Sequence, residues 1–552
     1  MRSASLGFDI GTSRVRCVVA DARTGEALGA GDAPLRSGRE GILEDPANPL
    51  VSRQAPGDYP IAMIAAARAA VDSARAATPN ALDIRGVGVA ATASTPIPVK
   101  RDARALAVDP AFAADLDAQA WLWRDHSAGA EAEEITDALA RVGAPALAAC
   151  GGSYSAEWYW SKILRCARSA PHVSTAAAGW LELCDFATAW LIGASTLEAA
   201  PRSVCTAGHK ALHVDVAAGG WGAVHTLAPL HPEIARLAAT LPAPSPLGAP
   251  AGVITPDIAD AIGISRNVVV SVGVIDAHAA ALGAGVRPGR LVSIVGTSAC
   301  HMGVAAPGVS VPRLAGVSGV VRGSILPECD GVEAGQAAVG DMFSAAARLV
   351  DGASLASLED EARRLPPGAG GLIALDWVNG VRAPVNDPFV SGAVFGLTLQ
   401  TRPAQLFRAY VEAAAYGLRA IIDHMARSGL TFTEVVACGG VVARSALAPQ
   451  IFADVLDRDL DILESIEAGA LGAAILAAAA SGMHESVAAA QTAMDARPDR
   501  RLRPNPDASA AYRSLYLDYA CLSEAFGRRG APLNALMRRL SERRTASSAP
   551  AP

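Results

Sequence analysis

Two short segments of this sequence share one pattern: an apolar strand, a Gly-Thr-Ser turn and a second apolar strand. The first runs from Leu6 to Ala20 and the second from Leu291 to Val304. Glycine lets the main chain approach a ligand closely, and the backbone N–H groups and hydroxyls of such a turn can bind phosphate oxygens. We call Gly11-Thr12-Ser13 the first cradle and Gly296-Thr297-Ser298 the second cradle. Two such turns, half a chain apart, predict two related halves that bind one polyphosphate in a cleft between them.

An aspartate, Asp9, stands just before the first cradle. A carboxylate beside a phosphate is repulsive unless a cation lies between them, so Asp9 is a candidate neighbour of a magnesium ion, directly or through water. The alternative is an aspartate that accepts hydrogen bonds from the N–H groups of its own turn. The second cradle favours the magnesium interpretation.

A second aspartate, Asp276, follows the apolar segment 268–274. A carboxylate at the carboxyl end of a strand can act as a base toward a sugar hydroxyl that accepts a phosphoryl group. It can equally cap a helix that starts at Ala277. Judged from these residues alone, capping is favoured.

Three further features are candidates for ligand contacts, each with an ordinary alternative. Gly439-Gly440 lies between a strand and a helix and could let a purine or ribose lie against the backbone, although glycine pairs at such junctions are common. Lys210 and Glu333 stand among small apolar residues and could hydrogen-bond a sugar. For either one taken singly, surface charge is the favoured interpretation.

Composition narrows the class of protein. The chain has 552 residues, of which 51% are hydrophobic and 18% charged, and its net charge is −7. These values fit a folded protein of two to four domains and give no basic footprint for nucleic acid or a membrane surface. The nine cysteines form no CxxC pair, so we interpret them as buried thiols of a reducing compartment. The N-terminus lacks the pattern of a secretory signal and no run is long enough to span a membrane, so we predict a cytoplasmic protein.

Alternating strand-like and helix-like segments must position these residues. Strands are expected at 84–91, 434–437 and 460–463, and helices at 61–76, 132–142, 157–167, 403–425, 445–456 and 468–480. Strands separated by helices predict an α/β fold with parallel sheets covered by helices. We place the domain boundary near 272, which gives one lobe over 1–272, a second over 273–540 and a disordered tail over 541–552.

Several longer runs resemble the FGGY family of carbohydrate kinases, within the actin/hexokinase-like superfamily. The resemblance covers residues 5 to 525, and its most specific runs are 121–128, 155–164, 207–210, 331–336 and 375–380. It implies two ribonuclease H-like lobes with a nucleotide cleft between them, and transfer of a phosphoryl group from ATP, with Mg²⁺, to a sugar.

The resemblance also implies roles for individual residues. Asp276 corresponds to the catalytic base and Asp9 to the magnesium-associated aspartate. The two cradles correspond to the phosphate-binding turns. The sugar pocket corresponds to Ala93, Lys210, Asp276 and Glu333. The nucleotide contacts correspond to Gly11, Thr12, Ser13, Gly296, Thr297, Ser298, Gly439, Gly440 and Ser445.

Two positions depart from the family pattern. Arg14 stands where the first cradle usually continues with serine, and it could contact phosphate or point outward. Ser445 stands where the adenosine motif usually has asparagine, and its shorter hydroxyl could weaken that contact. Neither change removes a group that the chemistry requires.

We therefore expect a ketopentose kinase with L-ribulose as the first substrate and ATP as the donor. The alternatives are a kinase for D-ribulose, xylulose or a polyol, a non-catalytic regulator that binds sugar or nucleotide, and an actin-like or chaperone ATPase. The partners expected are a small sugar and ATP, with no nucleic acid and no membrane. A homodimer is left open.

Overall fold

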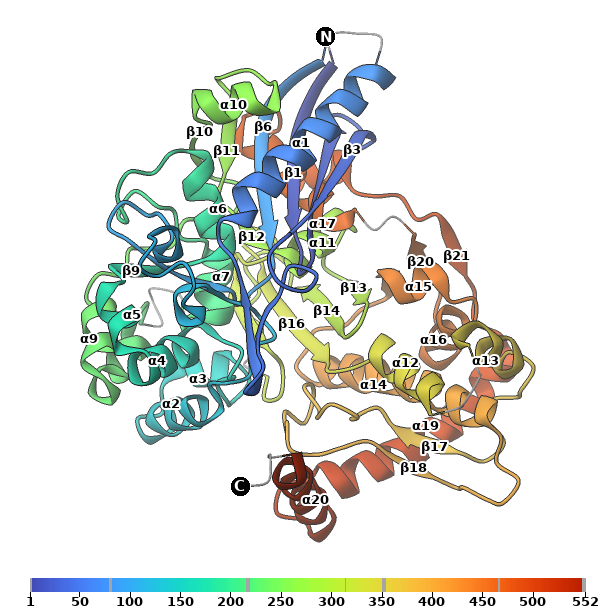
Figure 1. Ribbon diagram of the computed structural model, residues 1–552. Coiled ribbons are helices and arrows are strands. Elements are labelled where there is room, and N and C mark those ends of the chain that lie inside the picture. Colours follow the sequence, from blue (N-terminus) through green and yellow to red (C-terminus); the bar gives the residue numbers. More distant parts are fainter. Residues whose placement is uncertain are drawn as a thin grey trace.

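The chain forms two similar open sheets joined by helices. The computed structural model describes residues 2–78, 82–214, 219–312, 314–349, 354–464 and 467–548. In Figure 1 the first sheet, in blue and green, lies above and to the left of the second sheet, whose yellow-green and orange strands lie to the right.

The first sheet has seven strands in the order β10-β11-β6-β1-β2-β3, and β12 pairs with the far end of β6. β1 runs antiparallel to β2 and parallel to β6, while β6 runs parallel to β11 and β12. β2 and β3 are antiparallel. The strands are β1 (Arg2–Ile10), β2 (Arg14–Asp21), β3 (Ala27–Pro34), β6 (Leu82–Ala91), β10 (Pro250–Val253), β11 (Val269–Ser271) and β12 (Val274–Ile275).

The second sheet repeats this topology in the order β15-β16-β14-β13-β19-β20-β21. β13 is antiparallel to β14 and parallel to β19, and β14 is antiparallel to β16. β13, β14, β16, β19 and β20 thus correspond to β1, β2, β3, β6 and β11, so the two halves that the repeated cradle predicts share one strand order. The strands are β13 (Arg290–Val295), β14 (Ala299–Val304), β15 (Gly319–Arg322), β16 (Asp330–Gln336), β19 (Glu434–Cys438), β20 (Leu460–Leu463) and β21 (Arg500–Leu502).

Two helices, α11 (Asp276–Gly283) and α17 (Ala468–Ala480), connect the halves. α17 follows β20 in the chain but packs on β1 and β6 of the first sheet and crosses α11. Glycines allow these contacts, because a Cβ on Gly7 would stand 1.9 Å from the Ala470 oxygen, and a Cβ on Gly472 would stand 1.8 Å from the Ala279 oxygen. The far face of the first sheet is covered by α1 (Asp58–Ala77), which packs on β2 and β3.

A compact insertion between β6 and β10 packs around its own core, which contains Trp121, Trp160 and Trp180. It occupies the left side of Figure 1. Its strands are β7 (Pro96–Val99), β8 (Ala120–Trp121) and β9 (Gly179–Glu182), and β8 pairs with β5 (Asn48–Gln54), which in turn pairs with β4 (Leu43–Asp45). Its helices are α2 (Gly129–Arg141), α3 (Pro145–Ala149), α4 (Tyr159–Ser169), α5 (Pro171–Ala176), α6 (Leu183–Leu191), α7 (Val204–Lys210), α8 (Gly222–Thr226) and α9 (Pro232–Ala238), and α10 (Pro256–Ile262) follows β10.

The second half is completed by helices on its sheet. α14 begins at Pro403, where proline is well tolerated in a first turn, and packs against α16 and α12. The remaining elements are α12 (Gly340–Arg348), α13 (Leu355–Ala362), β17 (Ile373–Leu375), β18 (Ala393–Phe395), α14 (Pro403–Arg427), α15 (Gly440–Arg444), α16 (Ala448–Leu456), α18 (Val487–Met494), α19 (Pro506–Gly527) and α20 (Pro532–Ser548).

The chain end differs from the sequence-based expectation of a disordered tail over 541–552. α20 continues through Ser548, so the first part of that segment is helical, and residues 549–552 lie outside the described residues. Good helix formers supply the reason, since the segment from Ala535 to Arg544 is rich in arginine and leucine. Arg538 also anchors the helix through an ion pair of 2.8 Å with Asp387.

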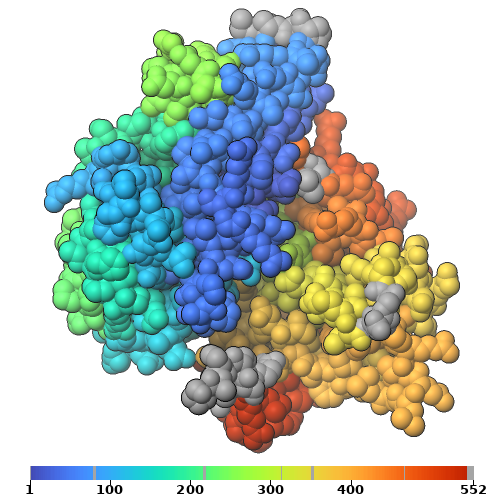
Figure 2. Space-filling view, in the orientation of Figure 1, coloured from blue at the N-terminus to red at the C-terminus, as the bar shows by residue number. Residues whose placement is uncertain are grey.

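The surface view separates the same parts of the chain. In Figure 2 the blue and green atoms of the first half fill the left and top of the molecule, and the yellow to red atoms of the second half fill the right and bottom. Among the described residues, no helix combines the length and the apolar character needed to cross a membrane.

Candidate active site

Three parallel strands of the first sheet end side by side. Ile10 of β1 is in register with Ala91 of β6, and Ala91 is in register with Ile275 of β12. The residues that follow these strands therefore leave the same edge of the sheet, which is where ligands bind in open α/β sheets. The first cradle, the segment that contains Ala93, and Asp276 are brought together in this way.

The first cradle is a tight hairpin turn. The Gly11 N–H donates to the Arg14 oxygen at 3.0 Å and closes the turn. Thr12 is held from two sides, because the Trp123 indole N–H of the insertion donates to its hydroxyl at 3.0 Å and the Gln54 amide of β5 donates to its carbonyl oxygen at 2.6 Å. Ser13 at the tip is exposed.

The second cradle is also a hairpin turn, at the end of β13, and it is one residue shorter than the first. The Gly296 N–H donates to the Ser298 oxygen at 2.9 Å, and the Val339 and Gly340 N–H groups donate to the Thr297 and Gly296 oxygens at 2.9 and 3.0 Å. Thr297 is exposed at the tip. Both cradles thus keep hydroxyls at accessible turn tips that are fixed through their backbones.

Gly439 and Gly440 lie next to the second cradle. β13 and β19 pair in parallel up to Ile294 and Cys438, so the glycines follow the neighbouring strand at the same edge. A Cβ on Gly439, whose φ is +102°, would lie 2.6 Å from the Val295 oxygen. Only glycine fits this close left-handed position.

Asp9 and Asp276 are partly buried carboxylates, and the charge of Asp9 acts on Asp276. Burial, followed by the charge of Asp9, raises the pKa of Asp276 to about 7. Burial also raises the pKa of Asp9, opposed by Arg16, whose guanidinium lies 3.7 Å from the Asp9 carboxylate. Asp276 begins α11, and its Oδ1 accepts a hydrogen bond of 2.7 Å from the Ala277 N–H. The capping interpretation is therefore wrong in detail, because the helix starts at Asp276 itself, with Ile275 as its N-cap and no side-chain cap. Asp276 still lies where the Asp9 charge acts on it.

The surroundings of Asp9 fit a hard divalent cation. The described residues give its carboxylate no hydrogen bond, and Arg16 is its ion-pair partner. A Cβ on Gly469, at the start of α17, would stand 3.0 Å from the Asp9 carboxylate carbon, so glycine keeps space beside it. Carboxylate and hydroxyl oxygens are the donors that magnesium prefers.

Lys210 and Glu333 join the two halves of the molecule. Lys210 ends α7 and Glu333 lies in β16, and the Lys210 ammonium lies 3.1 Å from Glu333 Oε2. Burial opposes ionisation of both groups, but each keeps the other charged, since Lys210 lowers the pKa of Glu333 and Glu333 raises that of Lys210. The indole ring of Trp158 lies 5.6 Å from the ammonium. Both residues are thus partners in one buried ion pair and are not solvated surface charges.

Two histidines border this ion pair. His209 Nδ1 lies 3.6 Å and His278 Nε2 lies 3.7 Å from Glu333 Oε2, and both rings are fully buried. Burial lowers the pKa of His278 to about 4 and lowers the pKa of His209 well below its ordinary value. Both imidazoles are therefore neutral at neutral pH.

The two departures from the family pattern have local explanations. Arg14 is about half exposed, and its guanidinium pairs with the Asp32 carboxylate of β3 at 2.8 Å. The Ser445 hydroxyl donates to Glu359 at 2.9 Å and accepts from the Ala448 N–H at 2.9 Å. Ser445 therefore accepts a hydrogen bond from the N–H of the first residue of α16, whose N-cap is Leu447.

Sequence analysis did not single out several residues that border the site. Glu157 and Arg382 form a second ion pair between the halves, at 3.1 Å. Trp123 fixes Thr12, although the run 121–128 was noted as a whole. Gly469, which keeps space beside Asp9, was not singled out either. Nothing in the local pattern predicts such partners, because each lies more than 100 residues from the group it serves.

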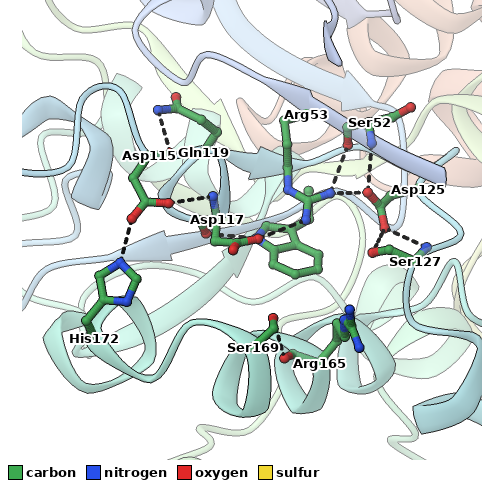
Figure 3. A network of polar contacts seen from close by, with 11 residues as sticks. Ser52, Arg53, Asp115, Asp117, Gln119, Asp125, Ser127, Arg165, Ser169 and His172 are labelled. Carbon is green, nitrogen blue, oxygen red and sulfur yellow. Dashed lines mark hydrogen bonds and ion pairs between the residues drawn. The ribbon is translucent and has the colours of Figure 1, made fainter. Parts of the chain in front are cut away.

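A buried polar network supports the segment that carries Trp123. Figure 3 shows Arg53 of β5 between two carboxylates, Asp125 and Asp117. Its guanidinium lies 3.5 Å from the centre of the Trp121 ring. Asp125 also accepts hydrogen bonds from the Ser52 and Ser127 N–H groups at 2.8 and 3.1 Å.

Replacing Asp125 by asparagine should destabilise the protein without touching a ligand. Arg53 is 1% and Asp125 0% exposed, so the variant leaves a buried cation with only the partly exposed Asp117 opposite it. Breaking a buried pair in this way costs about 3 kcal/mol. Urea unfolding followed by circular dichroism measures the change, with Asp260→Asn, which breaks an exposed pair with Arg266, as the matched control.

Comparisons with known proteins agree with this geometry. A model of the C-terminal domain of the FGGY family of carbohydrate kinases matches residues 291–481. A ribulokinase of Halalkalibacterium halodurans is 34% identical over 97% of this chain and 96% of its own length. A ribulokinase of Geobacillus thermodenitrificans is 35% identical over 95% of this chain and 94% of its own length.

A solved xylulose kinase of Rhodospirillum rubrum has a similar fold. It superposes with a TM-score of 0.75 at 22% identity and covers 95% of this chain and 99% of its own. The segment that matches the family model contains the second cradle, Glu333 and the Gly439-Gly440 pair.

Proposed function

This chain belongs to the FGGY family of carbohydrate kinases, and on that premise we propose that it transfers the γ-phosphoryl group of ATP to the terminal hydroxyl of L-ribulose. The product is L-ribulose 5-phosphate, as in arabinose breakdown. The two ribulokinases, related over nearly the whole chain, support ribulose as the sugar. The proposed fold is the two-lobed actin/hexokinase-like arrangement, with lobes over 1–272 and 273–540 and the nucleotide between them.

The observation that carries the proposal is the placement of Asp276. Asp276 follows β12 at the edge of the first sheet where the first cradle follows β1. Its carboxylate interacts electrostatically with Asp9 and Lys210. With the sugar bound, the carboxylate takes the proton from the terminal hydroxyl as that oxygen bonds to the γ-phosphorus. The bond between the γ-phosphorus and the bridging oxygen breaks, and ADP leaves.

The other residues position the two substrates. The cradles bind the phosphates through backbone N–H groups and the hydroxyls of Thr12, Ser13, Thr297 and Ser298, and Gly439, Gly440 and Ser445 border the nucleoside. Ala93, Lys210 and Glu333 bind the sugar, the last two through charge-assisted hydrogen bonds. Trp123 keeps the Thr12 hydroxyl in a fixed orientation.

Asp9 is the proposed neighbour of Mg²⁺. When bound, the ion neutralises charge on the phosphates. The chain's own contribution is a buried carboxylate with space beside it at Gly469.

The proposed location is the cytoplasm. The nine cysteines are all free, as is usual in a reducing compartment. A homodimer stays an untested prediction.

ADP release from a panel of sugars tests the substrate. The full chain with Mg-ATP is assayed with L-ribulose, D-ribulose, D-xylulose, L-xylulose and ribitol at matched concentrations, and a reaction without sugar gives the background. We expect the highest kcat/KM for L-ribulose. Preference for D-ribulose, xylulose or ribitol would reassign the substrate, and binding of sugar or ATP without ADP release would favour a non-catalytic regulator.

A further inference from the structure

A cluster of ligating groups borders the sugar pocket and shares Glu333 with it, but its two histidines have no role in the reaction proposed above. It consists of His209, His278 and Glu333, whose donor atoms all lie within 4.8 Å of one another. The cluster joins both halves, because His209 lies in α7, His278 lies in α11 and Glu333 lies in β16. The two imidazole rings are 4.5 Å apart between centroids.

The imidazole nitrogens that face Glu333 are buried and unpaired. His278 Nδ1 and Nε2 and His209 Nδ1 have no hydrogen-bond partner among the described residues, and contacts of 3.6 and 3.7 Å to Glu333 are too long to count as hydrogen bonds. Leaving such groups unpaired in a buried site costs about 1–3 kcal/mol each. A bound ligand that accepts their lone pairs removes that penalty.

The protonation of the His209 ring favours a ligand that accepts an electron pair from Nδ1, the nitrogen that faces Glu333. Its Nε2 lies 3.0 Å from the Ser324 hydroxyl, and that hydroxyl donates to the Val321 oxygen at 3.0 Å. The hydroxyl proton is thereby used, so Nε2 carries the ring proton and Nδ1 presents a lone pair. That lone pair points toward the Glu333 carboxylate, which repels it unless a cation lies between.

The spacing matches a small borderline metal ion. A tetrahedral Zn²⁺ binds imidazole nitrogen and carboxylate oxygen at about 2.0–2.2 Å, which places its ligand atoms about 3.4 Å apart. The measured nitrogen-to-oxygen distances of 3.6 and 3.7 Å need little adjustment. Space also exists beside His209, because a Cβ on Gly319 would stand 2.4 Å from its Nδ1.

We propose that His209 Nδ1, His278 Nε2 and a carboxylate oxygen of Glu333 form a binding site for a borderline divalent cation such as Zn²⁺ or Co²⁺, separate from the Mg²⁺ site at Asp9. Two imidazoles with one carboxylate select such ions over Mg²⁺, which prefers oxygen donors. Both rings are 0% exposed and Glu333 is 12% exposed, so the ion enters from the Glu333 side.

The cation and the sugar exclude each other. Glu333 Oε2 already pairs with the Lys210 ammonium, and an added divalent charge there repels Lys210 and occupies the oxygen that the sugar needs. This consequence rests on the proposed function, whereas metal binding itself does not. The site therefore acts as an inhibitory metal site.

Direct binding to the full chain tests the inference. Zn²⁺ is titrated calorimetrically, and Co²⁺ is followed by its visible d–d absorption, without nucleotide. We expect one Zn²⁺ per chain, with affinity reduced about tenfold or more in His209→Gln and in His278→Gln and unchanged in His172→Gln. The last is the matched control, because His172 forms an exposed pair with Asp115 at 2.6 Å (Figure 3), the kind of pair that binds metal adventitiously.

Two further measurements test the metal site even if one of the histidine variants does not fold. Zinc-edge X-ray absorption of the wild-type protein should report two imidazole ligands, and saturating L-ribulose should weaken Zn²⁺ binding. Binding with fewer than two imidazoles, loss of binding in His172→Gln, or no binding at all contradicts the site. Zn²⁺ binding in a chain that phosphorylates no sugar would contradict the proposed function alone, and an active kinase that binds no Zn²⁺ would contradict the metal site alone.

Discussion

Asp276→Asn should reduce kcat by roughly 10²–10⁴-fold, the contribution of a positioned general base, while the protein folds normally. Asparagine keeps the oxygen that accepts from the Ala277 N–H, so α11 starts as before. What the amide lacks is a basic oxygen for the proton of the sugar hydroxyl. Steady-state ADP release with L-ribulose and Mg-ATP measures the loss, and sugar binding is measured separately by calorimetry.

The matched control for this variant is Asp185→Asn. Burial raises the pKa of Asp185 to about 7, as it does for Asp276, but the Asp185 carboxylate accepts from the Ser203 N–H at 2.9 Å and not from a cradle element. We expect its kcat to stay within a few-fold of wild type. Near-normal turnover in Asp276→Asn would refute the base, and equal losses in both variants would mean that the effect is structural.

The wild-type pH profile provides a second readout of the same group. Because burial and Asp9 raise the pKa of Asp276 to about 7, the base is protonated below that pH, and kcat/KM for the sugar should fall about tenfold per pH unit there.

The stability of the protein should depend on pH in the opposite direction from kcat/KM. The folded state holds the extra proton between the ordinary aspartate pKa of 3.8 and the raised pKa of about 7, so the contribution of Asp276 to the free energy of unfolding decreases as the pH rises through that window. Asp276→Asn should remove this dependence, which thermal unfolding across that range measures.

Lys210→Met should lower kcat/KM for L-ribulose about 100-fold, because it removes charge-assisted hydrogen bonds that contribute about 1.5–3 kcal/mol each. The KM for ATP should change little, since Lys210 pairs with Glu333 and contacts neither cradle. The variant also leaves Glu333 as a buried charge whose chief cation is gone, which costs about 3 kcal/mol of stability. Initial rates with each substrate varied in turn, together with urea unfolding, measure both effects.

The double variant Lys210→Met/Glu333→Gln separates binding from stability. It leaves no unpaired charge, so the free energy of unfolding should recover most of the loss while kcat/KM stays low. Arg266→Met, which breaks the exposed pair with Asp260, is the surface control and should change neither quantity. Recovery of kcat/KM in the double variant would show that Lys210 only supports the fold.

Much of the secondary structure is local and could be predicted. The strand at 460–463 and the helix at 468–480 agree residue for residue with β20 and α17, and the strand expected at 84–91 is β6 (Leu82–Ala91). Apolar periodicity and flanking glycine or proline determine such elements within a few residues of sequence. The repeated cradle likewise predicted two related halves, and both sheets have the same strand order.

Contacts between residues that lie far apart in the chain could not be predicted from local patterns. The sequence placed α17 after β20 but contained no signal that it packs on β1 of the other half. Lys210 and Glu333 were each more plausible as surface charges until the fold brought them within 3.1 Å. For Asp276, local sequence favoured a cap before a helix starting at Ala277, whereas the helix starts at Asp276 and Ile275 is its N-cap.

By itself, then, the sequence determined the elements, the two turns that can bind phosphate, and the family to which their pattern belongs. These features depend on residue types and spacings within short segments. Only the tertiary structure decided which charges are buried together, which carboxylate lies near Asp9, and which imidazoles meet at Glu333. Those properties depend on how two sheets, formed half a chain apart, pack through α11 and α17, and no local pattern specifies that packing.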